Sequence, residues 1–420
     1  MHYIRLLRPP IFESSRAGLK IKVVVSITTD LGDSFLTPDA PLGVRVHVKS
    51  QSKTGPVWTE LTSRTSPPTW RAGLRVLKLE LPIPPALSRV FQLHVRPADE
   101  RLVASKSSVM ANGAQGLIVP VWVDVAAPGE ESAHVCSRIL KLFDDKPYTL
   151  HVEEEIGETN LARHIWDGGL MAVAHLANLL ASTPPPPGMV EGLIGVKEIL
   201  AQDKELNILE IGSGIGTLGI GLAQILQAGV LGRTKGANVL MTDLPEAEER
   251  IWANILRYNS ASNAVPGDSS ERAEVSVDYE NLDWEDGMKG VFGPKVRARL
   301  WDLIIISDCT YNTSTLMALA NTLAQVNRAN NELPDLPLVS GPGADGDGPS
   351  EPGWHSKLML ATKPRHVSER AFLGYFKGAC YYEGEHVELP LPMLDGDAQK
   401  VEIYLFTKKA WTKNIMLAEL

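Results

Sequence analysis

One short stretch, residues 208–219, constrains this chain most; it reads ILEIGSGIGTLG. Two apolar residues typical of a strand run into the acidic Glu210, and glycines follow at alternate positions, Gly212, Gly214 and Gly216. An apolar run with helical spacing comes next, which gives the order strand, glycine turn, helix. Glycine lets the backbone approach a ligand closely and adopt positive φ. The stretch therefore predicts a cradle for a nucleotide-like ligand in an α/β sheet.

The acidic residue at the strand end helps to choose that ligand. A carboxylate there repels a pyrophosphate but suits a ligand with a positive charge and free ribose or amino groups, and S-adenosylmethionine is such a ligand. The segment from Gly214 to Gly219 also matches GxGxxG, so a dinucleotide site or a purely structural turn remains open. The next acid at a strand end, Asp243, lies further on than the roughly 20 residues of a dinucleotide site, but spacing alone does not decide. We expect S-adenosylmethionine as the cofactor.

The size and composition of the chain exclude several classes of protein. Its 420 residues are enough for two domains, and they hold no 18-residue apolar run and no signal-peptide core. The three distant cysteines, Cys136, Cys309 and Cys380, argue against a disulfide framework or a zinc site and fit a reducing compartment. A net charge of −9 disfavours nonspecific nucleic-acid binding. We expect a cytoplasmic protein, with the nucleus as a second location, and neither membrane association nor a bound metal.

Residues 1–125 predict a β-rich domain. Pro, Ser and Thr clusters separate five stretches of alternating or β-branched residues. These stretches are 22–27, 43–48, 74–81, 90–95 and 117–123. A small antiparallel sandwich is the expected architecture. Nothing here carries obvious chemistry, so we interpret the region as a packing module or as one that docks the substrate or another partner. Residues 126–160 are expected to be a connector.

Residues 161–420 predict a doubly wound α/β domain. A helix is expected over 161–181, ending at the proline run 182–188, and strands then alternate with helices. The predicted strands are 207–211, 237–242, 273–277, 302–307, 357–362, 384–389 and 401–407, and the predicted helices are 217–229, 246–258, 314–329 and 367–377. The last two strands leave no room for a helix between them, so they should be antiparallel. This pattern is typical of a class I methyltransferase. Residues 331–353, rich in Pro, Gly and Asp, are expected to form a mobile surface insertion.

Five short segments occur in order along this region. They are IWDGGL at 165–170, the glycine loop, TDLP at 242–245, NLDW at 281–284 and SDCTYN at 307–312. On these segments, roughly residues 150 to 410 resemble the family 16, seven-β-strand protein-lysine methyltransferases. The resemblance implies a class I fold, S-adenosylmethionine as cofactor and a lysine of another protein as methyl acceptor. The first 125 residues do not resemble the family core.

Four side chains are expected around the cofactor besides Glu210 and the three glycines. Asp243 can accept both ribose hydroxyls or cap the following helix, and both can be true. Asp283 could accept the adenine amino group while Trp284 shields the ring; the alternative is a plain loop residue and a core tryptophan. The resemblance implies that Trp166 lines the cofactor pocket, although a Trp on an apolar helix face is often only part of the core.

Asp308 and Tyr311 are the candidate catalytic residues. They follow an apolar strand, on the edge where ligands bind to open α/β sheets, and they fit the family's signature of an acid with an aromatic residue three positions later. Methyl transfer to an amine is an in-line displacement, in which Asp308 could orient the amine and the ring of Tyr311 could stabilise its developing charge. The alternative is a turn-stabilising Asp beside a half-buried Tyr. Lys363 and Arg365 are either site residues or a solvated pair.

The leading hypothesis is an S-adenosylmethionine-dependent methyltransferase acting on a lysine of a protein substrate, with no nucleic-acid partner. Two alternatives stay open, a small-molecule N-methyltransferase and a catalytically degenerate methyltransferase fold that only binds. An open acidic groove would favour a protein acceptor, and a sealed pocket would favour a metabolite.

Overall fold

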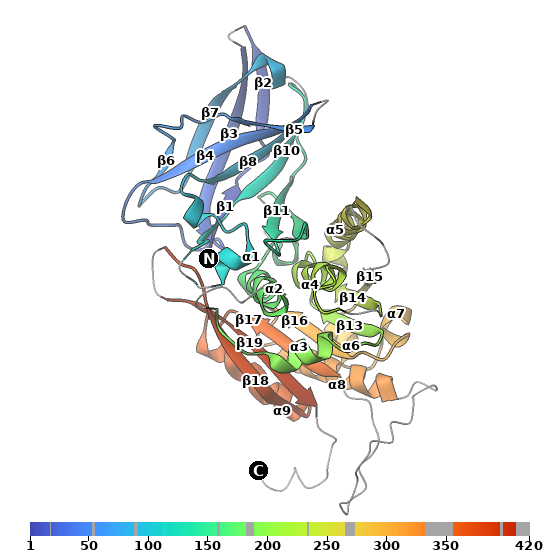
Figure 1. Ribbon diagram of the computed structural model, residues 1–420. Coiled ribbons are helices and arrows are strands. Elements are labelled where there is room, and N and C mark those ends of the chain that lie inside the picture. The colour runs from blue at the N-terminus through green and yellow to red at the C-terminus, as the bar shows by residue number, and fades with distance from the viewer. Residues whose placement is uncertain are drawn as a thin grey trace, which may run out of the picture.

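The computed structural model describes twelve parts of the chain. They are residues 1–16, 18–52, 55–87, 91–111, 113, 115–157, 160–181, 189–232, 235–264, 274–331, 356–394 and 398–408. Figure 1 shows a β-rich N-terminal region above an α/β region, with the two in contact. Every helix in these parts is too short or too polar to traverse a bilayer.

Two sheets form the N-terminal region. One has the order β2-β3-β1-β9 with β7 paired to β3, and the other has the order β12-β11-β10-β8-β4-β5 with β6 paired to β4. Alternating apolar residues of both sheets, such as Val44, Val46 and Val48 on β4, point into one shared core. The strands are β1 (His2–Leu6), β2 (Ile11–Ser15), β3 (Gly18–Thr29), β4 (Leu42–Ser52), β5 (Gly55–Glu60), β6 (Thr69–Trp70), β7 (Leu77–Ile83), β8 (Phe91–Pro97), β9 (Ile118–Val119) and β10 (Val121–Val125), with short helical turns η1 (Pro85–Leu87), η2 (Glu100–Leu102) and α1 (Ser107–Met110).

Residues 126–160 are not the connector that the sequence analysis expected. They contain β11 (Val135–Lys141) and β12 (Thr149–Glu155), an antiparallel hairpin at the edge of the second sheet. Leu150 and Val152 of this hairpin are buried in a core that also holds α/β residues, and β12 packs against α4 and α5. The two regions therefore share a hydrophobic core instead of being joined by a linker.

A buried ion pair explains why the sequence pattern hid this hairpin. Arg138 and Glu154 occupy buried positions of the two strands, where alternation would call for apolar residues. Their side chains lie 2.6 Å apart, and Arg138 also donates to the carbonyl of Pro120 at 2.8 Å. Charged residues are rarely buried unless they are paired, so hydrophobic periodicity alone does not reveal such strands.

A seven-stranded sheet forms the centre of the α/β region, in the order β15-β14-β13-β16-β17-β19-β18. The first five are parallel, and β19 is antiparallel to both of its neighbours. The predicted doubly wound sheet with a terminal antiparallel pair is thus confirmed. The strands are β13 (Leu206–Ile211), β14 (Ala237–Asp243), β15 (Val275–Asn281), β16 (Leu303–Ser307), β17 (Lys357–Thr362), β18 (Tyr381–Pro390) and β19 (Lys400–Lys408).

Helices cover both faces of this sheet. In Figure 1, α2, α4 and α5 lie on the face towards the N-terminal region, and α8 and α9 lie on the opposite face. Each face has its own hydrophobic core. The helices are α2 (Asp167–Leu180), α3 (Ile194–Leu200), α4 (Thr217–Gln227), α5 (Pro245–Ala264), α6 (Trp284–Gly287), α7 (Pro294–Arg297), α8 (Leu316–Asn331) and α9 (Phe372–Gly378), with the turns η3 (Leu161–Arg163) and η5 (Val367–Ala371).

The helix predicted over 161–181 begins later than expected. A single turn, η3, is capped by the side chain of Asn160, which accepts the N–H of Ala162 at 3.0 Å. The backbone then extends through His164 and Trp166, and α2 starts at Asp167. This break leaves residues 160–166 free to form a wall of the site described below. The proline run 182–188 and residues 332–353 of the expected insertion lie outside the described residues.

Candidate functional site

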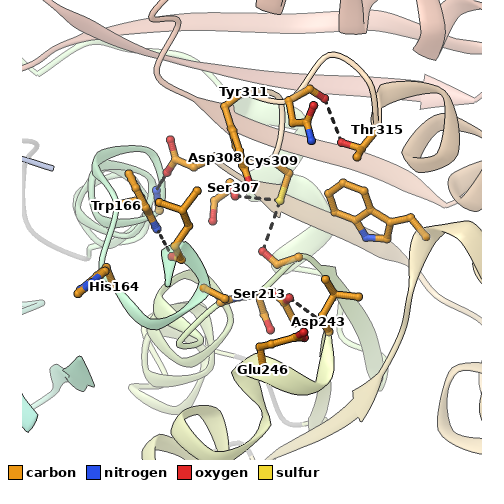
Figure 2. A pocket seen from close by; sticks show the side chains of 18 of the residues that line it. His164, Trp166, Ser213, Asp243, Glu246, Ser307, Asp308, Cys309, Tyr311 and Thr315 are labelled. Carbon is orange, nitrogen blue, oxygen red and sulfur yellow. Dashed lines mark hydrogen bonds between the residues drawn. The ribbon is translucent and has the colours of Figure 1, made fainter. Parts of the chain in front are cut away.

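A cavity of about 800 Å³ lies at the carboxyl-terminal edge of the parallel strands. Its lining comes from residues at and after the ends of all five parallel strands, from five residues between Asn160 and Trp166, from Gly169 of α2 and, in the N-terminal region, from Leu31. Figure 2 shows Asp308 and Tyr311 on the side of the cavity opposite Asp243. Of the ten site residues predicted from the sequence, the structure brings eight to this cavity: Trp166, Gly212, Gly214, Asp243, Asp283, Trp284, Asp308 and Tyr311.

The glycine loop owes its shape to close contacts that only glycine permits. Gly212 has a φ of +70°, and a Cβ there would overlap the sulfur of Cys309, whose thiol donates to the Gly212 carbonyl at 3.4 Å. The Gly212 N–H donates to the carbonyl of Thr242 at 2.9 Å, and the Gly214 N–H donates to Oδ2 of Asp243 at 2.7 Å. The loop is thereby tied to the end of the neighbouring strand, β14.

Glu210 and Gly216, the other two residues predicted for the cofactor, do not line the cavity. Glu210 is fully buried, and its Oε2 accepts the N–H of Gly219 in the first turn of α4 at 3.0 Å. Burial raises the pKa of Glu210 well above its ordinary value. Gly216 has a φ of 84° and is the N-cap of α4. In this structure both residues support the loop without facing the cavity, and the hydrogen bond of Glu210 connects α4 to β13.

Asp243 presents a partly buried carboxylate to the cavity. Its Oδ2 accepts the N–H of Gly214 and its Oδ1 accepts the N–H of Leu244, both at 2.7 Å, while burial raises its pKa. Each carboxylate oxygen has a second lone pair, so both can still accept ligand hydroxyls. Leu244 precedes the first residue of α5. The hydrogen bond from its N–H to Asp243 therefore stabilises the turn before the helix and does not cap an N–H within the helix.

Asp283 and Trp284 combine the two interpretations that the sequence left open. Asp283 is the N-cap of α6, where its Oδ1 accepts the N–H of Glu285 at 2.8 Å, and it also lines the cavity. Trp284 lines the cavity as well, although it is partly buried against the core on the α8 side of the sheet. Both residues can therefore contact a ligand while Asp283 caps α6 and Trp284 packs against the core.

Asp308 is held in an unusual conformation at the end of β16. Its φ is +53°, and its Oδ2 accepts the N–H of Gly169, in the first turn of α2, at 3.0 Å. A Cβ on the preceding Gly168 would lie 2.5 Å from the same oxygen, so the glycine pair is what lets the helix terminus approach the carboxylate. Burial raises the pKa of Asp308 to about 7, and its Oδ1 has no hydrogen-bond partner within the described chain.

Two aromatic residues flank this carboxylate. Tyr311 is 52% exposed, and burial of the remainder raises the pKa of its hydroxyl. Trp166 lies just before α2 and donates its Nε1–H to the carbonyl of Leu161 at 2.9 Å. Figure 2 shows Trp166 on the same side of the cavity as His164. Trp166 thus belongs to the cavity wall, and the purely core position that the sequence left open does not apply.

Lys363 and Arg365 do not form the solvated pair that one of the two interpretations expected. Lys363 is buried and bridges Asp30 and Asp167 at 2.9 and 2.8 Å. Arg365 lines the cavity, bonds to Asp30 at 2.7 Å and places its guanidinium carbon 5.5 Å from the ring centroid of Trp166. Buried charges of this kind need partners, and here the partner Asp30 comes from the N-terminal region.

Several cavity residues were missed by reading the sequence. They are Leu31, Asn160, Leu161, Ala162, His164, Ser307 and Glu369, which all line the cavity. The dipeptide of glycines at 168–169 was a usable signal, since two glycines at a helix start indicate a close approach by another group. Leu31 carried no signal, because only the packing of the two regions brings it to the site.

Comparisons with known proteins agree with this geometry. Residues 144–336 match the family described as lysine methyltransferase. A UPF0665 family protein from Schizosaccharomyces pombe is 24% identical over 390 residues, which cover 90% of this chain and 93% of that protein. The match therefore spans both the N-terminal and the α/β regions.

Solved structures of methyltransferases resemble part of this chain more distantly. A precorrin-6y C5,15-methyltransferase from Geobacter metallireducens is 10% identical, with a TM-score of 0.30, over 51% of this chain and 87% of its own. A 1,6-didemethyltoxoflavin-N1-methyltransferase from Burkholderia thailandensis, solved with S-adenosylhomocysteine, is 12% identical, with a TM-score of 0.28, over 49% and 72%. The strand order and the cavity described above, and not these scores, carry the argument.

Proposed function

We propose that this S-adenosylmethionine-dependent methyltransferase, whose residues 144–336 match the family described as lysine methyltransferase, transfers its methyl group to a lysine side chain of another protein. The observation that carries the proposal is the position of Asp308, whose unpartnered oxygen belongs to the same cavity as the glycine loop.

The residues at the glycine loop fit the cofactor. Gly212 leaves backbone exposed to the cavity, and Asp243 offers carboxylate oxygens with free lone pairs next to it. Asp283 and Trp284 follow the adjacent strand and line the same cavity, where they would meet a polar ring and its face. When bound, S-adenosylmethionine supplies a methyl group on a positively charged sulfur that leaves as a neutral thioether.

The charge of the cavity supports a basic acceptor. Six carboxylates line it, and Arg365 is the one lysine or arginine among the described lining residues. The carboxylates are Asp243, Glu246, Asp283, Glu285, Asp308 and Glu369. Such a field attracts a cationic side chain and raises its local concentration.

The mouth of the cavity supports a macromolecular acceptor. Large apolar side chains of the lining are unusually exposed: Leu31, Leu161, Leu244 and Tyr311. A sealed metabolite pocket would bury such groups, whereas an open apolar rim can receive the aliphatic stem of a lysine together with the surface that carries it.

Asp308 and Tyr311 then have distinct tasks at the acceptor nitrogen. The amine must be neutral to form the new N–C bond, and Asp308 can accept a hydrogen bond from it and so aim its lone pair. The ring of Tyr311 can stabilise the positive charge that develops on nitrogen. Loss of the extra proton to solvent or to Asp308, whose pKa of about 7 suits this exchange, completes the transfer.

The proposal is tested by tritium transfer from labelled S-adenosylmethionine into a lysate of cells that lack this protein. We expect label in protein, on lysine, and about tenfold less label with Tyr311→Ala at unchanged cofactor affinity. Label confined to the small-molecule fraction would favour the N-methyltransferase alternative. Absence of cofactor binding by calorimetry would favour a degenerate fold that only binds.

A further inference from the structure

We propose that the N-terminal region forms one wall of the acceptor end of the cavity, with Leu31 as a specificity-determining residue and Asp30 as a positioning residue for Arg365. This inference rests on the proposed function, because it assigns the part of that same cavity through which the acceptor enters. In this view the N-terminal region is not a separate docking module, because both regions contribute residues to a single site.

Leu31 is the point at which the N-terminal region reaches the cavity. It lies in the turn after β3 and is 46% exposed. The turn is fixed by backbone hydrogen bonds, from Thr29 N–H to the Ser34 carbonyl at 3.0 Å and from Gly32 N–H to the Thr29 carbonyl at 3.1 Å. An apolar side chain on a fixed turn at the mouth of a cavity is a surface that an incoming ligand must contact.

Asp30, the neighbour of Leu31, binds the α/β region through a buried carboxylate. Its Oδ2 accepts Nη2 of Arg365 at 2.7 Å, and its Oδ1 accepts Nζ of Lys363 at 2.9 Å and the N–H of Leu31 at 3.0 Å. Arg5 holds the Asp30 carbonyl at 2.6 Å. One side chain therefore fixes the turn that carries Leu31 and the loop that follows β17.

Arg365 takes its direction from this contact. Asp30 binds the edge of its guanidinium and Trp166 lies under the group, while the backbone N–H of Arg365 donates to Glu369 at 3.2 Å. Charge-assisted hydrogen bonds and stacking on an aromatic face both restrict a guanidinium strongly. Without the Asp30 carboxylate, the cation would be free to turn into a cavity that otherwise attracts a basic acceptor.

The same cluster reaches Asp308 by a second route. Asp167, the first residue of α2, accepts Nζ of Lys363 at 2.8 Å and the hydroxyl of Tyr3 at 2.7 Å. Two residues later, Gly169 donates its N–H to Asp308. The N-terminal region thus also fixes the helix terminus that orients the proposed acceptor-binding carboxylate.

The role of Leu31 is tested with Leu31→Arg against a matched control, Leu7→Arg. Leu7 belongs to the same region and is 44% exposed, but it does not line the cavity. A new cation at the acidic acceptor end should lower the initial rate of tritium transfer into lysate protein by about tenfold. The affinity for S-adenosylmethionine, measured by calorimetry, should stay within about twofold of the unmodified protein in both variants, and Leu7→Arg should transfer normally.

The role of Asp30 is tested with Asp30→Asn against Glu153→Gln. Glu153 on β12 binds Arg250 and Arg257 of α5, so it also joins the two regions, yet it does not line the cavity. We expect Asp30→Asn to raise by about fivefold the lysate concentration that gives half the maximal rate. Glu153→Gln should lower the melting temperature comparably and leave that concentration unchanged.

The outcomes separate this inference from the proposed function. Normal transfer by Leu31→Arg, a loss of cofactor affinity that matches its loss of transfer, or equal effects of Asp30→Asn and Glu153→Gln would each overturn the inference alone. No transfer by the unmodified protein, with cofactor binding intact, would overturn the proposed function and the inference together. Transfer to small molecules only, still reduced by Leu31→Arg, would support the wall and refute the protein acceptor.

Discussion

The cofactor end of the cavity is built from the ends of the neighbouring strands β13, β14 and β15, whereas the acceptor end is assembled from segments far apart in the chain. The first end needs only the local order strand, turn, helix, which a class I sheet places at one edge. The second combines Leu31, the turn after β16 and the loop after β17. Cofactor binding should therefore respond to local backbone changes, and acceptor recognition should respond to changes at the boundary between the two regions.

The largest expected effect is at the cofactor end. Gly212→Val should abolish detectable cofactor binding, because Gly212 has a φ of +70° and its added side chain would meet the Cys309 thiol. Calorimetric titration with S-adenosylmethionine measures this effect. Gly374→Ala is the control, since nothing lies within 4 Å of its position. An unchanged Kd for Gly212→Val would mean that the loop does not cradle the ligand.

The second-largest effect is expected at the acceptor end, on turnover and not on cofactor affinity. Asp308→Asn keeps the shape of the side chain but removes its charge, so turnover should fall about 100-fold while cofactor affinity stays nearly the same. Parallel loss of both quantities would place Asp308 at the cofactor instead.

The same residue should give the reaction a pH dependence. Because the pKa of Asp308 is raised to about 7, its carboxylate ionises across neutral pH, and the rate should rise with an inflection near pH 7 that Asp308→Asn lacks. The effect of the same titration on stability has the opposite sign to its effect on the rate. The folded state holds the proton more tightly than the unfolded chain, so this group's contribution to the free energy of unfolding falls as pH rises from about 4 to 7. If Asp308→Asn retained the inflection near pH 7, the inflection would have to arise from another titrating group.

An intermediate effect is expected at Asp243. Asp243→Ala should weaken cofactor binding by about 1–3 kcal/mol, since it would remove charge-assisted hydrogen bonds to ribose hydroxyls. Calorimetry and thermal melting should be measured together. A lower melting temperature with unchanged affinity would leave Asp243 only its contacts with Gly214 and Leu244.

The smallest effect is expected at Asp283, where local structure and ligand contact overlap. Asp283→Asn retains a capping side chain, while Asp283→Ala loses the cap of α6 and should cost about 1 kcal/mol of stability. If Asp283 accepts the adenine amino group, both variants should weaken cofactor binding severalfold. Normal affinity in the Asn variant would remove the residue from the adenine site.

The same contrast explains what the sequence could predict. The seven strands, their antiparallel terminal pair and the cavity residues next to the glycine loop followed from local patterns. Glu210 was expected to face the ligand, but a strand-end acid can equally turn beneath the next helix, and its bond to Gly219 shows that it does. The hairpin at 135–155 was missed because Arg138 and Glu154 are buried as a pair. Leu31 and Asp30 required knowledge of how the two regions pack.

The shared core described above also bears on how the chain folds as it leaves the ribosome. Tyr3 of β1 belongs to the same cluster as Leu405 of β19, nearly the whole chain apart, and Leu150 of β12 belongs to it as well. Contacts of such sequence separation close slowly, because a long loop must be ordered before they form. The inner surface of the N-terminal sheets can form early, but the surface that meets α2 and α4 must remain uncovered until those helices, which follow it in the chain, have been synthesised and have packed. We expect this late-covered apolar surface to be the part of the nascent chain that most needs chaperone protection.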